Sequence, residues 1–208
     1  MKLPRYYPIL DTATLERLGV QPEAAAAAML EGGARILQFR HKGHFSRAVF
    51  EQAERVARLC REAGAVFMVD DRADFAALLD AGVHVGQQDL PPAEARKIMG
   101  ASRVLGYSTH NRRQLELAAG EPADYLALGP IFGTGSKENP DPVVGVDGLR
   151  DLRALTSRPL AAIGGITREN AARVLEAGAD AVAVIGDALG ELKGLRARTE
   201  EWLEITGW

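Results

Sequence analysis

Cysteine is nearly missing from this sequence of 208 residues: Cys60 is the only one, so no intramolecular disulfide can form. Such sparing use of cysteine is typical of proteins in a reducing compartment. No apolar run approaches the roughly 20 residues that a membrane-spanning helix needs. The first residues do not show the charged-then-apolar pattern of a secretory signal. We therefore expect a cytoplasmic protein that makes no contact with a membrane.

A basic excess is also missing. Lysine and arginine together number 25 against 28 aspartates and glutamates, and the net charge is -3. A nucleic-acid surface needs cations that neutralise phosphates, so this composition argues against a nucleic-acid partner. No linker or low-complexity tract divides the chain, and its length is enough to bury a substantial core. We expect a single domain over residues 1–208, and the sequence leaves its oligomeric state, a homo-oligomer included, open.

What the sequence does contain is an alternation of short apolar runs, typical of strands, and longer helical stretches. The expected strands cover residues 7–10, 35–40, 65–69, 82–86, 103–107, 125–129, 160–163 and 181–185. The expected helices cover residues 22–31, 46–63, 73–79, 93–99, 112–119, 148–155, 168–177 and 188–203. Eight strand–helix units imply parallel pairing with right-handed crossovers. The fold class is therefore α/β with a closed (β/α)8 barrel, the TIM barrel, as the leading fold; an open, doubly wound sheet is the alternative.

Two acidic positions follow neighbouring strands of this scheme: Asp71 directly after the third, and Asp89 after the fourth. Neighbouring parallel strands lie about 4.8 Å apart, so the two carboxylates could share a hard divalent cation. Magnesium suits the pair better than zinc, because it is held by one or two carboxylates and by substrate phosphates. Zinc would need histidines or thiolates at a spacing that the chain lacks. The alternative is that both aspartates are helix N-caps.

The second strand carries polar side chains on one face. Gln38, Arg40 and Lys42 alternate with Leu37 and Phe39, which suit packing against helices. Polar side chains inside a barrel are costly unless they are paired or bind a ligand. Arginine and lysine suit phosphate oxygens, and glutamine suits a heterocycle. We interpret this face as a ligand site; the alternative is an ion pair with a carboxylate in the barrel core.

Glycine-rich turns mark a second region. Gly164 and Gly165 end the seventh strand and Gly186 ends the eighth, where TIM barrels frequently bind a phosphate. The alternative at the first turn is a tight turn with Thr167 as an N-cap. A long glycine- and proline-rich segment, residues 130–146, follows the sixth strand. We interpret it as a phosphate clamp rather than a solvated loop. The clamp residues would be Thr134, Ser136 and Lys137.

Two further residues have local interpretations. Ser108, in the turn after the fifth strand, could reach a ligand, or Thr109 or Asn111 could simply cap the next helix. His84 alternates with two valines and is expected to be a hydrogen-bonded core residue. A metal-bound diphosphate is a good leaving group, because the cation stabilises the charge that develops on departure. The residues therefore suggest a two-substrate transfer with loss of pyrophosphate.

In order and spacing, the motifs over nearly the whole chain resemble those of the thiamine phosphate synthase (thiamine-phosphate pyrophosphorylase) family. The matching pieces are residues 38–42, 70–72, 82–91, 106–110, 124–125, 129–132, 134–137, 162–166 and 184–185. The resemblance implies a transferase of thiamine biosynthesis. It would condense 4-amino-2-methyl-5-hydroxymethylpyrimidine diphosphate with 4-methyl-5-(2-phosphoethyl)thiazole, or its 2-carboxy form, and release pyrophosphate. It also implies that the pyrimidine's carbon–oxygen bond breaks first, giving a cation that the thiazole nitrogen captures.

The resemblance also implies roles by position. Asp71 and Asp89 would hold one Mg²⁺ per active site. The catalytic residues would be Lys137, Arg40 and Ser108. The phosphorylated small-molecule substrates would be contacted by Gln38, Phe39, Arg40, His41, Lys42, Asp70, Ser108, Thr134, Gly135, Ser136, Lys137, Gly165, Ile185 and Gly186.

Two positions depart from the family's usual pattern: Asp70 stands where an asparagine is usual, and Gly186 where a serine is usual. The extra carboxylate of Asp70 could strengthen the metal site or change the contact that the protein makes with the pyrimidine amino group. Gly186 keeps a backbone N–H but offers no hydroxyl. A thiazole tautomerase of the same superfamily and a non-catalytic phosphometabolite-binding barrel are the alternative functions. Lys42, Asp71 and Asp89 argue against the tautomerase, whose members typically lack them.

Overall fold

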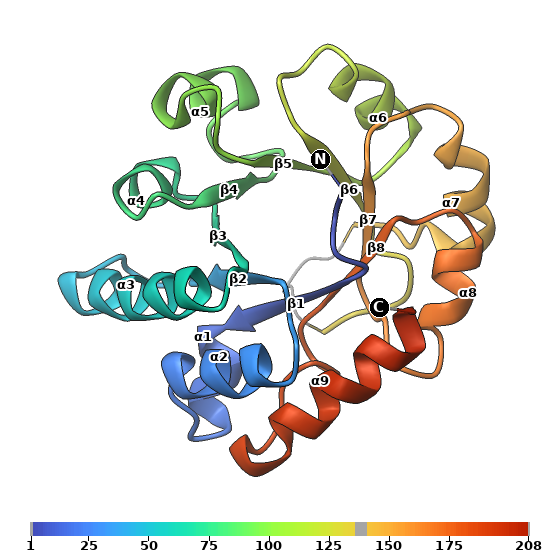
Figure 1. The fold of residues 1–208 in the computed structure, drawn as a ribbon. Coiled ribbons are helices and arrows are strands. Elements are labelled where there is room, and N and C mark those ends of the chain that lie inside the picture. The colour runs from blue at the N-terminus through green and yellow to red at the C-terminus, as the bar shows by residue number, and fades with distance from the viewer. Residues whose placement is uncertain (1, 136–140, 208) are drawn as a thin grey trace.

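The computed structural model describes residues 2–135 and 141–207. Its strands are parallel and close into a barrel in chain order, from β1 round to β8, with the helices on the outside (Figure 1). Tyr6 of β1 lies opposite Val182 of β8, so the sheet has no open edge. The predicted (β/α)8 barrel is confirmed, and the open, doubly wound alternative is wrong.

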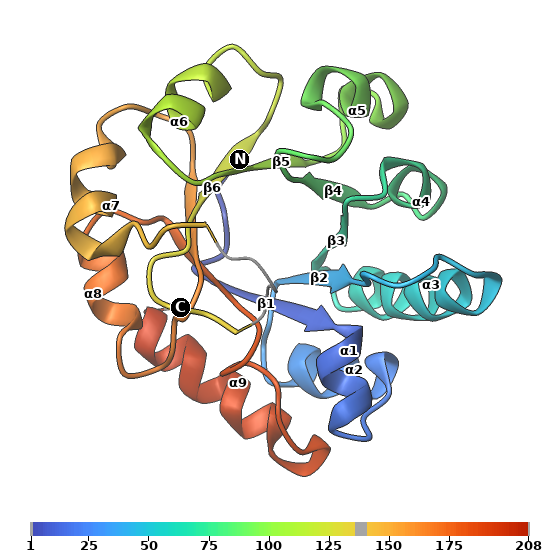
Figure 2. The same cartoon turned by 180° about the vertical axis from the view of Figure 1, so that it is seen from behind.

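The elements alternate regularly along the chain, and the view from behind shows the same ring of helices around the barrel (Figure 2). The strands are β1 (Tyr6–Asp11), β2 (Ile36–Arg40), β3 (Val66–Asp70), β4 (Gly82–Val85), β5 (Leu105–Thr109), β6 (Tyr125–Leu128), β7 (Leu160–Ile163) and β8 (Ala181–Val184). The helices are α1 (Thr12–Arg17), α2 (Pro22–Glu31), α3 (Arg47–Glu62), α4 (Ala73–Leu78), α5 (Pro92–Met99), α6 (Arg112–Ala118), α7 (Gly145–Arg153), α8 (Ala171–Glu176) and α9 (Leu192–Thr206).

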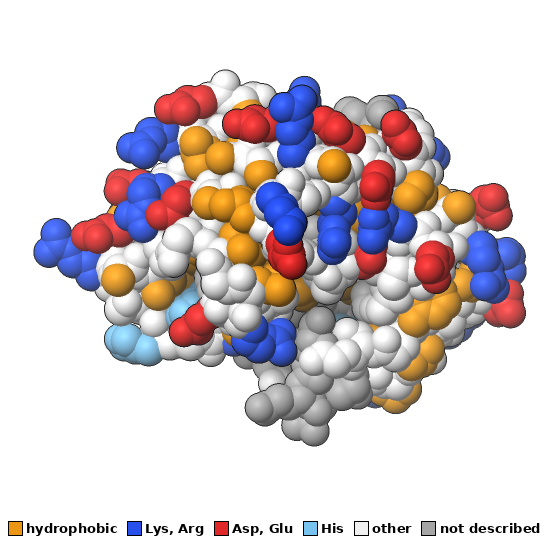
Figure 3. Space-filling view, turned by 90° about the horizontal axis from the view of Figure 1, so that it is seen from below, with side chains coloured by type: hydrophobic (Ala, Val, Ile, Leu, Met, Phe, Trp, Pro, Cys, Tyr) orange, Lys and Arg blue, Asp and Glu red, His pale blue; other side chains and the backbone are white. Residues whose placement is uncertain are grey.

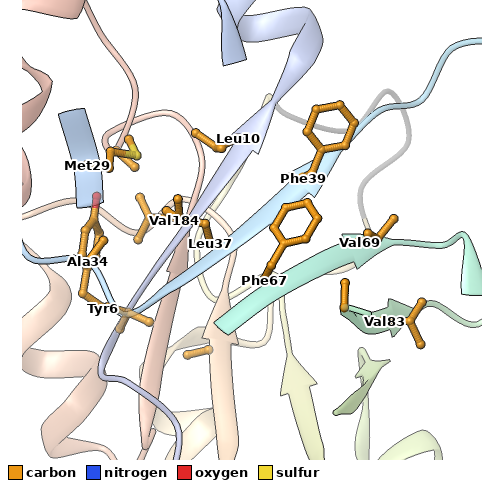
Figure 4. Packing of buried hydrophobic residues seen from close by; sticks show 14 of the residues in the cluster. Tyr6, Leu10, Met29, Ala34, Leu37, Phe39, Phe67, Val69, Val83 and Val184 are labelled. Carbon is orange, nitrogen blue, oxygen red and sulfur yellow. The ribbon is translucent and has the colours of Figure 1, made fainter. Parts of the chain in front are cut away.

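Side chains point alternately to the two faces of each strand, and this divides the core into two parts. One apolar cluster fills the barrel interior, where Tyr7 and Tyr125 are the largest side chains and alanines line β6, β7 and β8. The other lies between the strands and the helices. Figure 4 shows Phe39 of β2 and Phe67 of β3 lying next to each other in that layer. Burying one such phenylalanine contributes about 1.5–3 kcal/mol, so the outer layer anchors the helices and leaves the strand ends for polar residues.

Helix α3 illustrates how the sequence attaches a helix to the barrel. Ser46 begins it, accepting a hydrogen bond from the backbone N–H of Val49 at 3.4 Å. The buried face repeats at helical spacing through Ala53, Val56 and Cys60. Cys60 is fully buried, and burial raises the pKa of its thiol to about 12. The thiol is therefore a small, unreactive core group.

Several predicted boundaries are wrong. Helix α1 is absent from the prediction because its six residues are too few to show a helical period; it forms because the Asp11 carboxylate accepts from the Thr14 N–H at 2.9 Å. Strand β5 ends at Thr109, two residues later than predicted, because pairing with β6 continues to that residue. Helices α7, α8 and α9 also differ from the predicted ranges by three or four residues where they begin.

The outer surface carries charges of both signs. On the face drawn in Figure 3, acidic and basic side chains are interspersed, and neither sign gathers into a stripe. Within the described ranges, no helix combines the length and the apolar character that crossing a membrane would require.

Candidate active site at the carboxyl ends of the strands

The side chains of β2 alternate between the two faces of the strand as predicted. Gln38 and Arg40 face the barrel interior, whereas the Phe39 side chain is fully buried on the helix side. Contact between Phe39 and a ligand is therefore restricted to its backbone. Arg40 donates to the carboxylate of Asp11, and its Nε lies 3.6 Å from Oδ2 of Asp70. The ion-pair alternative for this strand is thus confirmed, and ligand binding by Arg40 stays a prediction.

Asp11 had no place among the predicted site residues. It ends β1 and lies opposite Arg40 of β2 in the strand register. Burial alone would raise the pKa of its carboxyl, but the hydrogen bonds from Thr14 and the Arg40 guanidinium outweigh burial and lower that pKa. Asp11 therefore stays ionised and fixes Arg40. The signal in the sequence that could have indicated Asp11 as a site residue is its position as the acidic residue at the end of the apolar run of β1.

Lys42 and His41 follow β2 and lie on different sides of it. The Lys42 ammonium is 2.8 Å from Oδ2 of Asp70 and also pairs with Asp71. His41 instead contacts α1, with its Nδ1 2.8 Å from Oγ1 of Thr12. Lys42 is therefore among the acidic residues of the site, while His41 supports the loop that follows β2.

Asp71 is held in an unusual backbone conformation directly after β3. Its φ is 63°, in the left-handed region that aspartate tolerates better than most residues. Its backbone N–H donates to the carbonyl of His84 at 2.8 Å, which extends the pairing of β3 with β4. The chain thereby turns the Asp71 carboxylate toward Lys42 and Asp89.

Asp89 completes the acidic group from the loop after β4. Its Oδ2 accepts from the backbone N–H of Gly86 at 2.7 Å, which fixes the loop. Its side chain is also in hydrogen-bonding contact with Asp71. The predicted pair of neighbouring carboxylates therefore forms. The N-cap alternative is wrong, because α4 begins after Arg72 and α5 after Pro91, and neither helix has a side-chain cap.

Electrostatics at this group favour a cation. Burial, the charge of Asp70 and the hydrogen bond with Asp89 raise the pKa of the Asp71 carboxyl, and they outweigh the opposing effect of Lys42. Burial acts to lower the pKa of Lys42, but Asp70 and Asp71 outweigh it and raise that pKa. Asp70 and Asp71 thus share one ammonium with Asp89 beside them, and an added positive charge would relieve the repulsion among the carboxylates. Within the described ranges, histidine, cysteine and acidic residues form no three-membered group that could hold a metal by itself.

Ser108 lies on β5 itself, not in the turn after it as predicted. Its hydroxyl is 2.8 Å from Nε2 of His84, which confirms His84 as a hydrogen-bonded core residue. The cap of α6 is Asn111, whose Oδ1 accepts from the backbone N–H of Gln114 at 3.0 Å. Ser108 is thereby left free of any capping role.

The glycines after β7 serve packing. The backbone N–H of Phe132 donates to the carbonyl of Gly164 at 2.9 Å, so the start of the 130–146 segment extends along the end of β7. A Cβ on Gly165 would lie 2.5 Å from the carbonyl oxygen of Gly133, and its φ is +64°. Only glycine permits this close approach. The first turn of α8 lies beyond Asn170, so Thr167 is not its N-cap.

The remaining predicted residues lie at the same end of the barrel or outside the described ranges. Ile185 and Gly186 follow β8, and a Cβ on Gly186 would meet no atom within 4 Å. Thr134 and Gly135 belong to the segment after β6. Ser136 and Lys137 lie outside the described residues.

Comparisons with known proteins bear on the whole chain. Residues 6–188 match the model of the family described as thiamine monophosphate synthase. The chain is 46% identical to a thiamine-phosphate synthase of Koribacter versatilis over 99% of this chain and 97% of the relative. The chain belongs to the thiamine monophosphate synthase family. A relative from Chloroflexus aurantiacus with the same name is 44% identical over 87% of this chain and 83% of its own length.

A solved structure of the family has the same fold. It is a thiamine phosphate pyrophosphorylase from Pyrococcus furiosus, 34% identical, with a TM-score of 0.86 over 98% of this chain and 95% of that one.

The buried interior of the barrel holds polar residues that sequence reasoning missed. Tyr7 and Tyr125 contact each other there, hydroxyl to hydroxyl at 3.0 Å. Aromatic residues in strands look like ordinary core, so no signal in the sequence marked them.

Proposed function

We propose that this chain condenses 4-amino-2-methyl-5-hydroxymethylpyrimidine diphosphate with the thiazole phosphate, forming thiamine phosphate and releasing pyrophosphate. The observation that carries the proposal is the cluster of Arg40, Lys42, Asp71 and Asp89 at the carboxyl ends of β2 to β4. This end of a TIM barrel is where its enzymes place their active sites. Two small phosphorylated molecules are the partners that this site would accept.

The donor set fits Mg²⁺. Asp71 and Asp89 supply two neighbouring, half-buried carboxylates, and with Asp70 they outnumber the single ammonium of Lys42. Such a set suits a hard cation that takes its other ligands from water and substrate phosphates. When bound, the cation would supply charge neutralisation to the diphosphate. Asp70 is placed to hold Lys42 at the edge of this cation site.

The chain's own cations are placed for the diphosphate leaving group. The bond between the pyrimidine methylene carbon and the diphosphate oxygen breaks, and its electron pair leaves with pyrophosphate. Arg40 and Lys42 would take up that developing negative charge, together with Lys137 from the segment after β6. The thiazole nitrogen then donates its lone pair to the methylene carbon. Gln38 and Ser108 would contact the pyrimidine ring between these charges.

The thiazole phosphate would bind across the barrel from the acidic group. Gly165, Ile185 and Gly186 lie after β7 and β8, where backbone N–H groups are available to an anion. Thr134, Gly135 and Ser136 would add to this site from the segment after β6. The arrangement separates a diphosphate half with cations from a monophosphate half with backbone donors.

A pyrophosphate-release assay with both substrates tests the proposal. Asp71→Asn and Asp89→Asn should each lower Mg²⁺-dependent turnover by on the order of 10²-fold, the loss typical when one electrostatic stabiliser is removed. EDTA should abolish the wild-type activity. Asp151→Asn is the matched control, because Asp151 is an exposed aspartate in the last turn of α7, at the end of that helix that leads to the start of β7. Full activity of both site variants in EDTA would contradict the metal site, and no turnover by wild-type protein would contradict the function.

A further inference from the structure

A chain of hydrogen bonds crosses the barrel interior beneath the site. The amide Nε2 of Gln38 donates to the Tyr7 hydroxyl at 2.9 Å, and that hydroxyl is 3.0 Å from the hydroxyl of Tyr125. The Tyr125 hydroxyl is 2.8 Å from Nδ1 of His84, whose Nε2 is 2.8 Å from the hydroxyl of Ser108. Five side chains from β1, β2, β4, β5 and β6 are thus linked, and the two end residues are those predicted to contact the pyrimidine.

The middle of this chain is sealed from water. Tyr7 is 1% exposed and Tyr125 is fully buried, and burial raises the pKa of each phenol far above its ordinary value. Both hydroxyls therefore keep their hydrogens. The fold makes room for the contact at Gly106, where a Cβ would lie 2.4 Å from Nδ1 of His84. A buried hydroxyl without a partner costs about 1–3 kcal/mol, so the hydrogens of the Tyr7 and Tyr125 hydroxyls each need an acceptor within the chain of hydrogen bonds.

This requirement fixes the direction of the hydrogen bonds. The Gln38 amide nitrogen is only a donor, so the Tyr7 oxygen accepts from it and the Tyr7 hydrogen goes to Tyr125. The Tyr125 hydrogen then goes to Nδ1 of His84, which must be unprotonated to accept it. A neutral imidazole carries its hydrogen on the other nitrogen, so Nε2–H donates to Ser108. With the Gln38 amide nitrogen on Tyr7, as in this structure, the opposite direction would leave the Tyr7 hydrogen without an acceptor.

We infer that Gln38, Tyr7, Tyr125, His84 and Ser108 form a one-directional hydrogen-bond relay that holds His84 as its neutral Nε2–H tautomer and sets the polarity of the two groups that meet the substrate ring. Tyr7, Tyr125 and His84 are positioning residues, since they act through Gln38 and Ser108. The inference rests on the proposed function only in naming the ring as an aminopyrimidine.

The polarity at the two ends is complementary to such a ring. Ser108 receives a hydrogen from His84, so its own hydrogen is available to a ring nitrogen. Gln38 uses its amide nitrogen on Tyr7, so the carbonyl oxygen on the opposite arm of the amide is available to an N–H group. A 4-aminopyrimidine presents both an N–H donor and a nitrogen acceptor. A 4-oxopyrimidine presents the reverse pattern, and the relay would reject it.

The tautomer can be measured without any substrate. ¹⁵N NMR of the full-length protein labelled at its four histidines, with His84 assigned by loss of its signals in His84→Gln, reports which ring nitrogen carries the hydrogen. The expected result at neutral pH is a protonated Nε2 and a bare Nδ1. In Tyr125→Phe the hydroxyl that donates to Nδ1 is removed, and the His84 signals should shift toward a mixture of tautomers. A wild-type His84 protonated at Nδ1 would overturn the relay.

The functional consequence is measured as a ratio. The kcat/KM for the aminopyrimidine diphosphate, divided by that for the 4-oxo analogue, should fall by about tenfold or more in Tyr7→Phe. Tyr6→Phe is the matched control: Tyr6 is the preceding residue on β1, is also 1% exposed, and faces α9, where its ring stacks on Trp202 with centroids 5.1 Å apart. The ratio should be unchanged in that variant. An equal loss for both diphosphates in Tyr7→Phe would overturn the role in specificity.

The two failures can be told apart. If wild-type protein releases no pyrophosphate from the aminopyrimidine diphosphate, the proposed function is wrong, and the tautomer measurement still decides the relay. If turnover is normal but His84 carries its hydrogen on Nδ1, the function stands and the relay is wrong.

Discussion

Replacing Gly106 by alanine adds one methyl group at the most crowded point of the barrel interior. A Cβ built on Gly106 would lie 2.2 Å from Cζ of Tyr125 and 2.4 Å from Nδ1 of His84. Neither neighbour can withdraw cheaply, because both are buried and hydrogen-bonded to each other at 2.8 Å. Gly106→Ala should therefore separate Tyr125 from His84.

The cost can be estimated from two contributions. Overpacking a core by a methyl group typically costs about 1–3 kcal/mol. Leaving the buried Tyr125 hydroxyl without its acceptor adds about 1–3 kcal/mol. We expect a loss of about 2–6 kcal/mol in the free energy of unfolding, which for a chain of this length lowers the melting temperature by about 4–24 °C.

Urea unfolding followed by circular dichroism measures this loss. The matched control is Gly194→Ala in α9, where a Cβ would meet no atom within 4 Å and where alanine should be neutral or stabilising by up to about 1 kcal/mol. Combining Gly106→Ala with Tyr125→Leu should recover part of the loss, because the smaller side chain vacates the space. A Gly106→Ala protein within about 0.5 kcal/mol of wild type would refute this account of the barrel interior.

Three further predictions concern the site. In Asp11→Asn the side-chain oxygen can still cap α1 but the charge beside Arg40 is lost, whereas Asp11→Ala loses both. Asp11→Ala should therefore be about 1 kcal/mol less stable than Asp11→Asn in urea unfolding, and both variants should have a higher KM for the diphosphate. Equal stability of the two variants would contradict the cap. Because burial and Asp70 raise the pKa of Asp71, its protonated fraction grows as the pH falls. The Mg²⁺ concentration for half-maximal activity should therefore rise between about pH 8 and about pH 6, and a flat profile would argue against Asp71 as a ligand. A serine side chain at position 186 would meet open space, so Gly186→Ser should leave the free energy of unfolding within about 0.5 kcal/mol of wild type. Its hydroxyl should add one hydrogen bond to the thiazole phosphate and lower the KM for that substrate about fivefold. An unchanged KM would place the phosphate elsewhere.

The parts of the fold that could be predicted are those fixed by local pattern. Helix α2 begins and ends at the predicted residues, because Pro22 starts it and Gly32 and Gly33 end it. The meeting of Lys42, Asp71 and Asp89 was also predictable. Parallel strands in chain order bring their carboxyl ends to one edge, so residues after β2, β3 and β4 had to lie near one another.

The parts that could not be predicted depend on contacts between distant positions. Tyr7 and Tyr125 are 118 residues apart, and nothing local distinguishes them from apolar core residues. The end of β5 depends on its pairing with β6, so the local sequence alone predicts a strand that ends at residue 107 and places Ser108 in a turn. Asp11 acquires its role only when β1 and β2 are set in register. The chemistry of the site was readable from the chain, and the supports that orient it were not.

Cys60 gives this protein a built-in reporter of its own opening. The thiol is the only one in the chain, lies fully inside the contact between α3 and the barrel, and has a pKa raised to about 12. A thiol-specific reagent can modify it only when that contact opens, so the labelling rate under native conditions measures how often α3 leaves the barrel. Every variant proposed above keeps Cys60. One labelling experiment, without denaturant, can therefore distinguish a substitution that loosens the whole barrel from one that disturbs only the mouth of the site.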